Sequence, residues 1–595
     1  MWFKGSAAAL CVLGVGSGAG AYPFLPRGTS SFPVDLGYAV YEGTRDLNNS
    51  INVFKGIRYA APPLGNLRFA APQPPAANRT GTQLATSDPP ICPQTGASKE
   101  TPAAYGFKSA LGNEDCLFLN VYAPADASDL PVFFWIHGGG YGLFSATGLD
   151  PTEIMTTNGN GFISVIIQYR LGAFGFLAGD QVKEHGALNA GLLDMNLALK
   201  WVQENIKKFG GDPNRVTIAG ESAGAGAVMY QAMAYGGAQN ESLFNNIIAA
   251  SPWVPYQHGY NDAFPTAAYN DFAGAAGCRN STSTLQCLRE ADTVVLQNAS
   301  AQVSEAGPFG TFAFTPVTDG DFVQQSASKQ LVSKALSGKR ILSANMANEG
   351  IPLSPPYTKT LHDFRNYINI TFPLFLPDDK LDLEKQYSYD GDDQSVNPSA
   401  PLFATDGTNL PSSVNQSAFG TGQQQRVFNV FAEQSFDCPS YWFASAFPQA
   451  WKYQFSGLPA YHGFDLQALW SKTHLPGQSF KHAFRKIWGN FIIDDDPTIT
   501  VADAQGGDVD SIVPIGKDGV LINWPLWDDG NPQLLSLNTT GGVAKLLNVT
   551  EYLKYYTYSD PGVVNVIQVA DADTWEGGRG ERCKWWLEHA AKVPY

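Results

Sequence analysis

Short runs of hydrophobic residues alternate along the chain with segments in which hydrophobic positions recur every three or four residues. Two such runs cover residues 131–136 and 163–167, and each ends at turn-forming or polar residues. Continuous hydrophobic runs of this length are typical of strands that are covered on both faces. Further strand-like runs follow at 215–219, 246–250, 340–342 and 451–455.

An amphipathic helix is predicted between the second and third of these strands. One helical face collects the hydrophobic residues Leu192, Met195, Leu199, Val202 and Ile206. Glycine and proline at 210–213 then end the helix. This alternation predicts an α/β protein with a large, mostly parallel central sheet flanked by helices. Residues 257–335 and 377–425 are weakly periodic and rich in small polar residues, and we expect them to form long insertions over the sheet.

The beginning of the sequence has the pattern of a secretory signal. Lys4 precedes an apolar stretch at 7–15, and Ala19-Gly20-Ala21 has the small residues that signal peptidase accepts. We expect residues 1–21 to be a signal peptide and residues 22–595 to form a single domain. The apolar stretch is too short and too rich in glycine to span a bilayer, and no later run of 18 apolar residues exists. These features predict a secreted, extracellular protein without an integral membrane segment.

Composition narrows the possible partners. The chain has 38 Lys+Arg against 54 Asp+Glu, a formal net charge of −16, and no long basic run. Nucleic acid is therefore excluded as a partner, because polyanion binding needs clustered basic residues. A hydrophobic fraction of 44% excludes wholesale disorder, since it can supply a large core.

The cysteines and sequons agree with secretion. Cys11 belongs to the signal peptide, which leaves Cys92, Cys116, Cys278, Cys287, Cys438 and Cys583. Many pairings are open in principle. Pairs between sequence neighbours, 92 with 116 and 278 with 287, would close short loops and leave 438 with 583. Neither C-x-x-C nor H-E-x-x-H occurs, so we expect no metal site. Candidate glycosylation sites are Asn48, Asn78, Asn240, Asn280, Asn298, Asn369, Asn415, Asn538 and Asn548.

The first candidate for chemistry is the segment Gly220-Glu221-Ser222-Ala223-Gly224. Ser222 is the only serine with glycine two positions before and two positions after it. The segment follows the strand at 216–219 and precedes a helix-compatible stretch at 225–231. A strand-to-helix reversal this tight exposes the serine hydroxyl at a helix N-terminus, where backbone N–H groups stabilise negative charge. The alternative is an ordinary glycine-rich turn.

A serine nucleophile needs donors for the negatively charged oxygen of its tetrahedral intermediate. His137-Gly138-Gly139-Gly140 directly follows the strand at 131–136. Consecutive glycines allow backbone N–H groups to converge on one point, and the N–H of Ala223 would complete the set. We therefore predict an oxyanion hole formed by Gly139, Gly140 and Ala223. The alternative is a flexible glycine hinge.

With these motifs in order, the chain resembles the type-B carboxylesterase family, the cholinesterase-like branch of the α/β-hydrolase fold. The likeness covers nearly the whole mature chain. It includes FKGIRY at 54–59, PPLGNLRF at 62–69, EDCLFLN at 114–120, YRLG at 169–172 and FGGDP at 209–213. The three cysteine pairs named above fall where three-disulfide members carry theirs. Met195 stands where many members have glutamine, and no function is attached to this difference.

The resemblance also selects the partners of Ser222. Histidines beyond the serine are His258, His362, His462, His474, His482 and His589. Only His462 follows a strand-like run and continues as Gly-Phe-Asp, similar to the family's H-G-x-[DE] segment. Glu349 lies in a segment similar to the family's N-x-x-x-E-G turn, although it could be a solvated loop carboxylate. The order Ser222, Glu349, His462 is that of α/β-hydrolases. Glu221 and Ser251 occupy supporting positions around the site in the family.

The resemblance implies a secreted serine carboxylic ester hydrolase that forms an acyl-enzyme and needs neither a metal nor an organic cofactor. Its partner would be a small-molecule ester. The loop between Cys92 and Cys116 has no tryptophan, only Tyr105 and Phe107, which disfavours choline esters because cation–π binding prefers tryptophan. Short to medium or aromatic acyl esters are favoured, with triacylglycerol lipase or sterol esterase as alternatives. A non-catalytic adhesion protein is disfavoured, because such relatives lack the nucleophile.

Overall fold

The computed structural model describes residues 32–101, 106–239, 243–388, 417–507, 510–516 and 520–593. The predicted signal peptide, Tyr105 and the sequons at Asn240 and Asn415 lie outside these residues.

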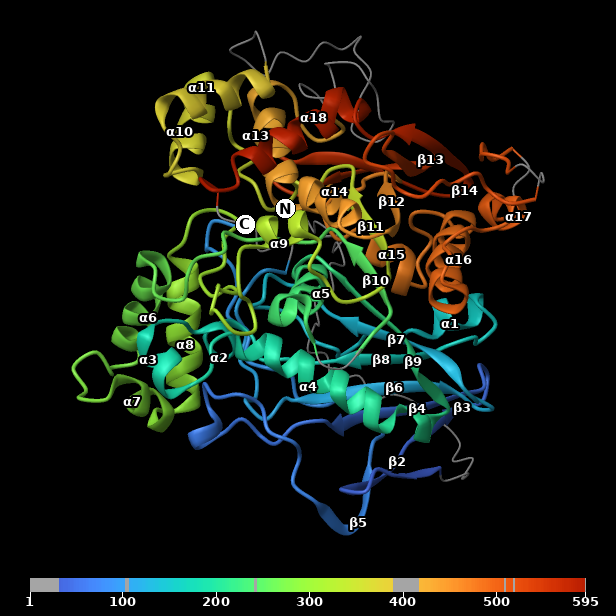
Figure 1. Ribbon diagram of the computed structural model, residues 1–595. Coiled ribbons are helices and arrows are strands. Elements are labelled where there is room, and N and C mark those ends of the chain that lie inside the picture. The colour runs from blue at the N-terminus through green and yellow to red at the C-terminus, as the bar shows by residue number, and fades with distance from the viewer. Residues whose placement is uncertain are drawn as a thin grey trace, which may run out of the picture.

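A large central sheet is the frame of the molecule (Figure 1). Its strands are β3 (Thr44–Asp46), β4 (Ile51–Arg58), β6 (Phe118–Pro124), β7 (Leu130–Ile136), β8 (Ile163–Ile167), β9 (Gly211–Glu221), β10 (Asn246–Ala250), β11 (Arg340–Met346), β12 (Gln449–Phe455), β13 (Gln533–Asn548) and β14 (Lys554–Asp571). They lie in the order β14-β13-β12-β11-β10-β9-β7-β8-β6-β4-β3. A second sheet joins β1 (Pro33–Asp35), β2 (Ala39–Glu42) and β5 (Asn78–Leu84).

The centre of the large sheet is parallel and its margins are antiparallel. The run from β8 through β7, β9, β10, β11 and β12 to β13 is parallel at each pairing. The pairs β13 with β14, β8 with β6, β6 with β4 and β4 with β3 are antiparallel. The predicted α/β fold with a mostly parallel sheet is confirmed. The long β13–β14 hairpin was not predicted, because its strands carry polar residues and glycines along much of their length.

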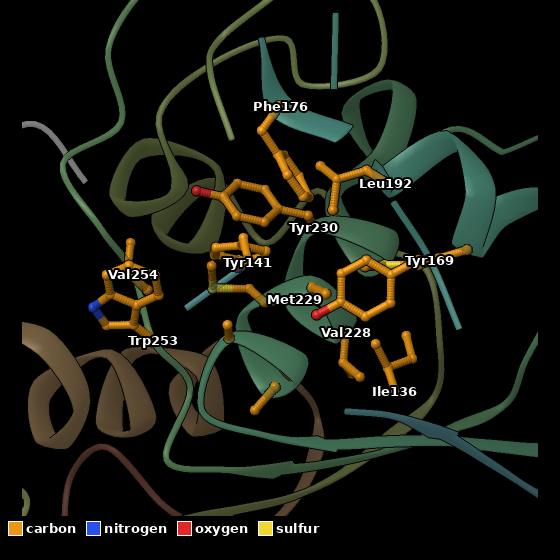
Figure 2. Close-up of a cluster of buried hydrophobic side chains, with 14 of the residues drawn as sticks. Ile136, Tyr141, Tyr169, Phe176, Leu192, Val228, Met229, Tyr230, Trp253 and Val254 are labelled. Carbon is orange, nitrogen blue, oxygen red and sulfur yellow. The ribbon is translucent and has the colours of Figure 1, made fainter. Parts of the chain in front are cut away.

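Both faces of the sheet are covered, as the hydrophobic strands require. Val132, Phe134 and Ile136 of β7 belong to one core, and the intervening Phe133 and Trp135 belong to the other. The first core packs against α4 (Ala190–Asn205), α5 (Ala223–Met233), α14 (Cys438–Ser445) and α18 (Trp575–Glu588), and the second against α1 (Thr152–Thr157), α15 (Asp465–Trp470) and α16 (Gln478–Asp494). Figure 2 shows part of the first core, where large aromatic side chains surround α5.

The remaining helices lie in connections and insertions. They are α2 (Gly172–Phe176), α3 (Asp180–His185), α6 (Ala263–Ala275), α7 (Thr284–Glu290), α8 (Thr293–Glu305), α9 (Ala327–Ser333), α10 (Leu361–Thr371), α11 (Pro377–Gln386), α13 (Gly422–Ala432) and α17 (Val501–Gln505). The weakly periodic insertion at 257–335 thus folds into four helices, and α6, α7 and α8 are grouped beside the sheet (Figure 1). Local constraints stabilise them: Asp292 caps α8, and a disulfide joins α7 to the turn after α6.

The predicted disulfides are confirmed as Cys92–Cys116, Cys278–Cys287 and Cys438–Cys583. Most described sequons are exposed, namely Asn48, Asn78, Asn280, Asn298, Asn369 and Asn548. Asn538, in contrast, is only 6% exposed and lies within β13. Among the described residues, no helix combines the length and the apolar character needed to cross a bilayer.

Candidate active site

Ser222 occupies the reversal between β9 and α5. Its backbone has φ 59° and ψ −128°, a strained conformation for a residue with a side chain. Gly220 and Gly224 allow the tight turn, because a Cβ on Gly220 would collide with the backbone of Gly224, and a Cβ on Gly224 with that of Ile136. The Ser222 N–H donates to the Ala250 carbonyl at 3.0 Å, which ties the turn to β10.

His462 and Glu349 lie beside Ser222. The Oγ of Ser222 is 2.8 Å from Nε2 of His462, and Nδ1 of His462 is 2.6 Å from Oε2 of Glu349. The three residues follow β9, β11 and β12, and the carboxyl ends of parallel strands meet at one edge of the sheet. Glu349 is fully buried, and its Oε1 accepts the Met346 N–H at 2.6 Å. The sequence-predicted trio therefore forms one continuous hydrogen-bond chain.

The glycine loop after β7 lies next to this chain. Ile136 pairs with Gly220 in the sheet, and a Cβ on Gly138 would be 3.0 Å from Cβ of Ser222. Gly139 and Gly140 have φ 98° and 62°, left-handed conformations that glycine adopts without strain. Ala223 begins α5, where backbone N–H groups have no partner inside the helix. The loop that carries Gly139 and Gly140 and the N-terminus of α5 at Ala223 therefore both adjoin Ser222.

His137, the first residue of the glycine loop, is held in place by Tyr169. Its ring stacks on Tyr169 at 4.5 Å between centroids, and the Tyr169 hydroxyl donates to the His137 carbonyl at 2.8 Å. Burial lowers the pKa of His137 to about 4. This imidazole is therefore neutral at ordinary pH, and it brings no charge into the glycine loop.

Two further carboxyl groups face the same histidine. The Oε1 of Glu221 is 3.4 Å from Nε2 of His462 and has no hydrogen-bond partner among the described residues. Burial, followed by the nearby charge of Glu349, raises the pKa of Glu221 well above its usual value. Burial also raises the pKa of Asp465, with Glu221 and Glu349 adding to the effect. In both groups burial therefore favours the protonated form of the carboxyl group.

Ser251 lies just behind Ser222. It is fully buried at the end of β10 with φ 53°, and its N–H donates to the Ala344 carbonyl at 2.9 Å. Its hydroxyl has no hydrogen-bond partner among the described residues. Ser251 therefore supports the turn by its backbone, and it does not touch the Ser222–His462–Glu349 chain through any described hydrogen bond.

Aromatic side chains surround the serine and the histidine. Phe312 lies so close to Gly140 that a Cβ there would enter its ring. Its ring centroid is 5.7 Å from that of Trp253 and 6.4 Å from that of Phe107. Phe436 covers the His462 ring at 4.1 Å between centroids. Phe312, Trp253 and Phe436 were not predicted from sequence, because no motif distinguishes them from other core aromatics.

The reacting groups are recessed, since Ser222 is 7% and His462 is 9% exposed. Trp253 stacks on Tyr141 at 5.5 Å, and Figure 2 shows both against the core beneath α5. Within the described ranges, no group of three or more His, Cys, Asp or Glu side chains could hold a metal ion. The arrangement can activate a serine hydroxyl, and it offers an apolar surround for an uncharged acyl group.

Comparison with known proteins gives consistent relatives. Residues 36–553 match the model of the carboxylesterase family. Lipase 4 of Diutina rugosa is 30% identical over 532 residues, which cover 83% of this chain and 90% of that lipase. Lipase 2 of Geotrichum candidum is 36% identical over 346 residues, which cover 52% of this chain and 61% of that lipase. The crystal structure of Aspergillus niger EstA superposes with a TM-score of 0.71 at 25% identity, covering 95% of this chain and 99% of EstA.

Proposed function

The chain belongs to the carboxylesterase family of carboxylic ester hydrolases, and from this membership we propose that it cleaves esters through an acyl-enzyme on Ser222. The observation that carries the proposal is the hydrogen-bond chain from Ser222 Oγ through His462 to Glu349, with distances of 2.8 and 2.6 Å. A serine hydroxyl is a poor nucleophile at neutral pH, and an adjacent base held by a third group removes this barrier.

In the first half-reaction, Oγ of Ser222 attacks the acyl carbon while its proton moves to Nε2 of His462. The carbonyl oxygen becomes an oxyanion beside the N–H groups of Gly139, Gly140 and Ala223. Collapse of the tetrahedral intermediate breaks the ester C–O bond, and His462 returns the proton to the leaving alkoxide. Glu349 accepts the hydrogen bond from Nδ1 and stabilises the imidazolium in the interval.

In the second half-reaction, water takes the place of the alcohol. His462 accepts a proton from the water, whose oxygen attacks the acyl carbon. The bond between that carbon and Oγ of Ser222 then breaks, and the proton returns to Oγ. The products are a carboxylic acid, an alcohol and free enzyme. All atoms and protons of the ester and the water are accounted for, so the reaction needs no metal or organic cofactor.

The favoured substrates are esters of short to medium or aromatic acids. The aromatic wall of Phe312, Trp253 and Phe107 stands beside Gly140, where the acyl carbonyl would lie. Rigid rings at this place limit the length of an acyl chain but suit a flat or short one. Triacylglycerol lipase is the second candidate, because Lipase 4 of Diutina rugosa, matched over 83% of this chain, is named a lipase.

We also infer that the enzyme is secreted, with residues 1–21 removed and residues 22–595 forming one catalytic domain. The disulfides support this inference, because such bonds persist in oxidising compartments. The exposed sequons, Asn48 and Asn280 among them, are the proposed glycan acceptors.

Hydrolysis of p-nitrophenyl butyrate by the purified protein tests the proposed function. Ser222→Ala should lower kcat/KM by at least about ten-thousand-fold, because the triad acts as a unit. Ser304→Ala is the matched control: Ser304 is equally buried, but its hydroxyl donates to the Gly96 carbonyl at 2.8 Å. Full activity of S222A, or an inactive wild type, would overturn the proposal. A panel that compares butyrate with palmitate esters separates esterase from lipase.

A further inference from the structure

A lysine lies buried beneath the candidate active site. Lys452 of β12 has no exposed surface, and its Nζ donates to Oδ1 of Asn345 at 2.6 Å and to Oγ of Ser440 at 2.8 Å. Nζ also lies 4.6 Å from the centroid of the Tyr441 ring. It forms no ion pair with a carboxylate of the described residues. Burial of an ammonium without a paired carboxylate is costly, so a lysine at this place needs a reason.

A series of hydrogen bonds connects Lys452 with Glu349. Asn345 lies at the end of β11, and its Nδ2 donates to the Met346 carbonyl at 2.9 Å. The Met346 N–H in turn donates to Oε1 of Glu349 at 2.6 Å. Because Oδ1 of Asn345 faces the ammonium, the orientation of its amide is fixed. Lys452 therefore orients Asn345, and the Asn345 amide binds the carbonyl of Met346, the residue whose N–H positions the Glu349 carboxylate.

The charges around Lys452 come from three elements. Asp437 belongs to a π-helical turn (Glu433–Asp437) and lies 3.4 Å from Nη2 of Arg579 on α18. In the same layer, Arg582 binds Glu433 with distances of 2.8 and 2.6 Å. The titratable groups that face Lys452 are Asp437, Glu349 and Arg579, with Tyr441 at its ring face.

Four buried carboxyl groups lie in this region: that of Glu349 and those of Glu221, Asp437 and Asp465. Their charges repel one another, so the positive groups nearby decide which of them is ionised. Burial, together with Glu349 and Glu433, raises the pKa of Asp437 to about 8, and burial lowers the pKa of Lys452 to about 7. Glu349 is among the groups that raise the pKa of Lys452 against the effect of burial, so the ammonium and this carboxylate interact favourably.

We propose that Lys452 is a positioning residue for ester hydrolysis: it orders Asn345, and its positive charge acts on Glu349, the carboxylate that holds His462. The inference rests on the proposed function, because it assigns Lys452 a part in the same reaction. A positive charge near the Ser222–His462–Glu349 hydrogen-bond chain disfavours the addition of a further proton to that chain. Removal of the charge should therefore move the acid limb of the pH–rate profile to higher pH.

The experiment compares Lys452→Met with Lys481→Met in the full-length enzyme. Lys481 is 1% exposed, like Lys452, but it lies on α16 and donates to the Thr473 carbonyl at 2.6 Å. For K452M we expect kcat to fall by about tenfold or more with KM changed less than about threefold, and the acid limb of kcat/KM to rise by at least about half a pH unit. K481M should leave the limb in place, even if its melting temperature falls.

A second pair of variants covers the case in which K452M does not fold. Lys452→Gln keeps a hydrogen-bond donor without the charge and should still move the acid limb. Asn345→Ala removes the hydrogen-bond link and should lower kcat with a smaller shift of the limb. The inference is overturned if a folded, charge-free variant keeps the wild-type limb and kcat. An inactive wild-type enzyme, or an active S222A, would instead overturn the proposed function.

Discussion

Nε2 of His462 lies 2.8 Å from Oγ of Ser222, although 240 positions separate the two residues in the chain. The parallel sheet causes this meeting, because β9 and β12 release their next residues at the same edge. Glu349 enters between them from β11. The proposed roles follow from these contacts: Nε2 of His462 faces the Ser222 hydroxyl, and Nδ1 of His462 faces the Glu349 carboxylate.

The two carboxyl groups around His462 should contribute unequally. Glu349 accepts the Nδ1 hydrogen bond at 2.6 Å, whereas Glu221 lies 3.4 Å from Nε2 and burial raises its pKa. Glu349→Gln should lower kcat by about a thousandfold or more, because an amide can hold the wrong tautomer of the histidine. Glu221→Gln should lower it by less than about tenfold, because glutamine keeps the size of the side chain and Oε1 of Glu221 makes no described hydrogen bond that could be lost. Steady-state kinetics of both variants on one ester measure the contrast, and equal losses would contradict it.

Phe312 should limit the acyl chain. Its ring lies against Gly140 and is 7% exposed. Phe312→Ala should therefore raise the ratio of kcat/KM for octanoate over acetate esters by about tenfold, since space opens beside the oxyanion loop. Phe322→Ala serves as the control, because Phe322 is also buried, at 2% exposed, but packs on Tyr235. An unchanged ratio in F312A would remove this ring from the acyl pocket.

Asp437 should make the folded state less stable as pH rises. The pKa of Asp437 rises from 3.8 to about 8 on folding, mainly through burial. Between these values the native state holds a proton that the unfolded chain has released, so this contribution to stability is lost from pH 4 towards pH 8. Asp437→Asn should raise the melting temperature more at pH 8 than at pH 5. Thermal unfolding at both values measures it, with the exposed Asp528→Asn as control.

The disulfides should differ in their contribution to stability. Cys438–Cys583 closes a separation of 145 residues and Cys278–Cys287 one of only 9. In the chain-entropy model, replacing both cysteines of the long pair with alanine costs about 5 kcal/mol, and of the short pair about 2.6 kcal/mol. Denaturant unfolding of the two double variants should show the order. A smaller loss for the long pair would mean that the unfolded chain retains structure around it.

Local patterns predicted much of the frame. The continuous hydrophobic runs at 131–136 and 163–167 correspond to β7 and β8, because strands that are buried on both faces consist mostly of hydrophobic residues. The four helices at 257–335 escaped prediction, since capping residues and a disulfide stabilise them instead of a strong apolar stripe. The β13–β14 hairpin also was not predicted, because backbone pairing between its two strands stabilises its exposed half and no hydrophobic pattern marks that half in the sequence.

The sequence by itself determined the serine turn and the glycine loop, because each depends on neighbouring residues, and it suggested the cysteine pairs without excluding the other pairings. The sequence identified His462 and Glu349 as candidates only through the resemblance of their segments to motifs of the family. Only the tertiary structure decided what surrounds them: Phe312 beside Gly140, Phe436 over His462 and Lys452 below Asn345. These contacts join residues far apart in the chain, and the packing of strands and helices, not any local pattern, brings them together.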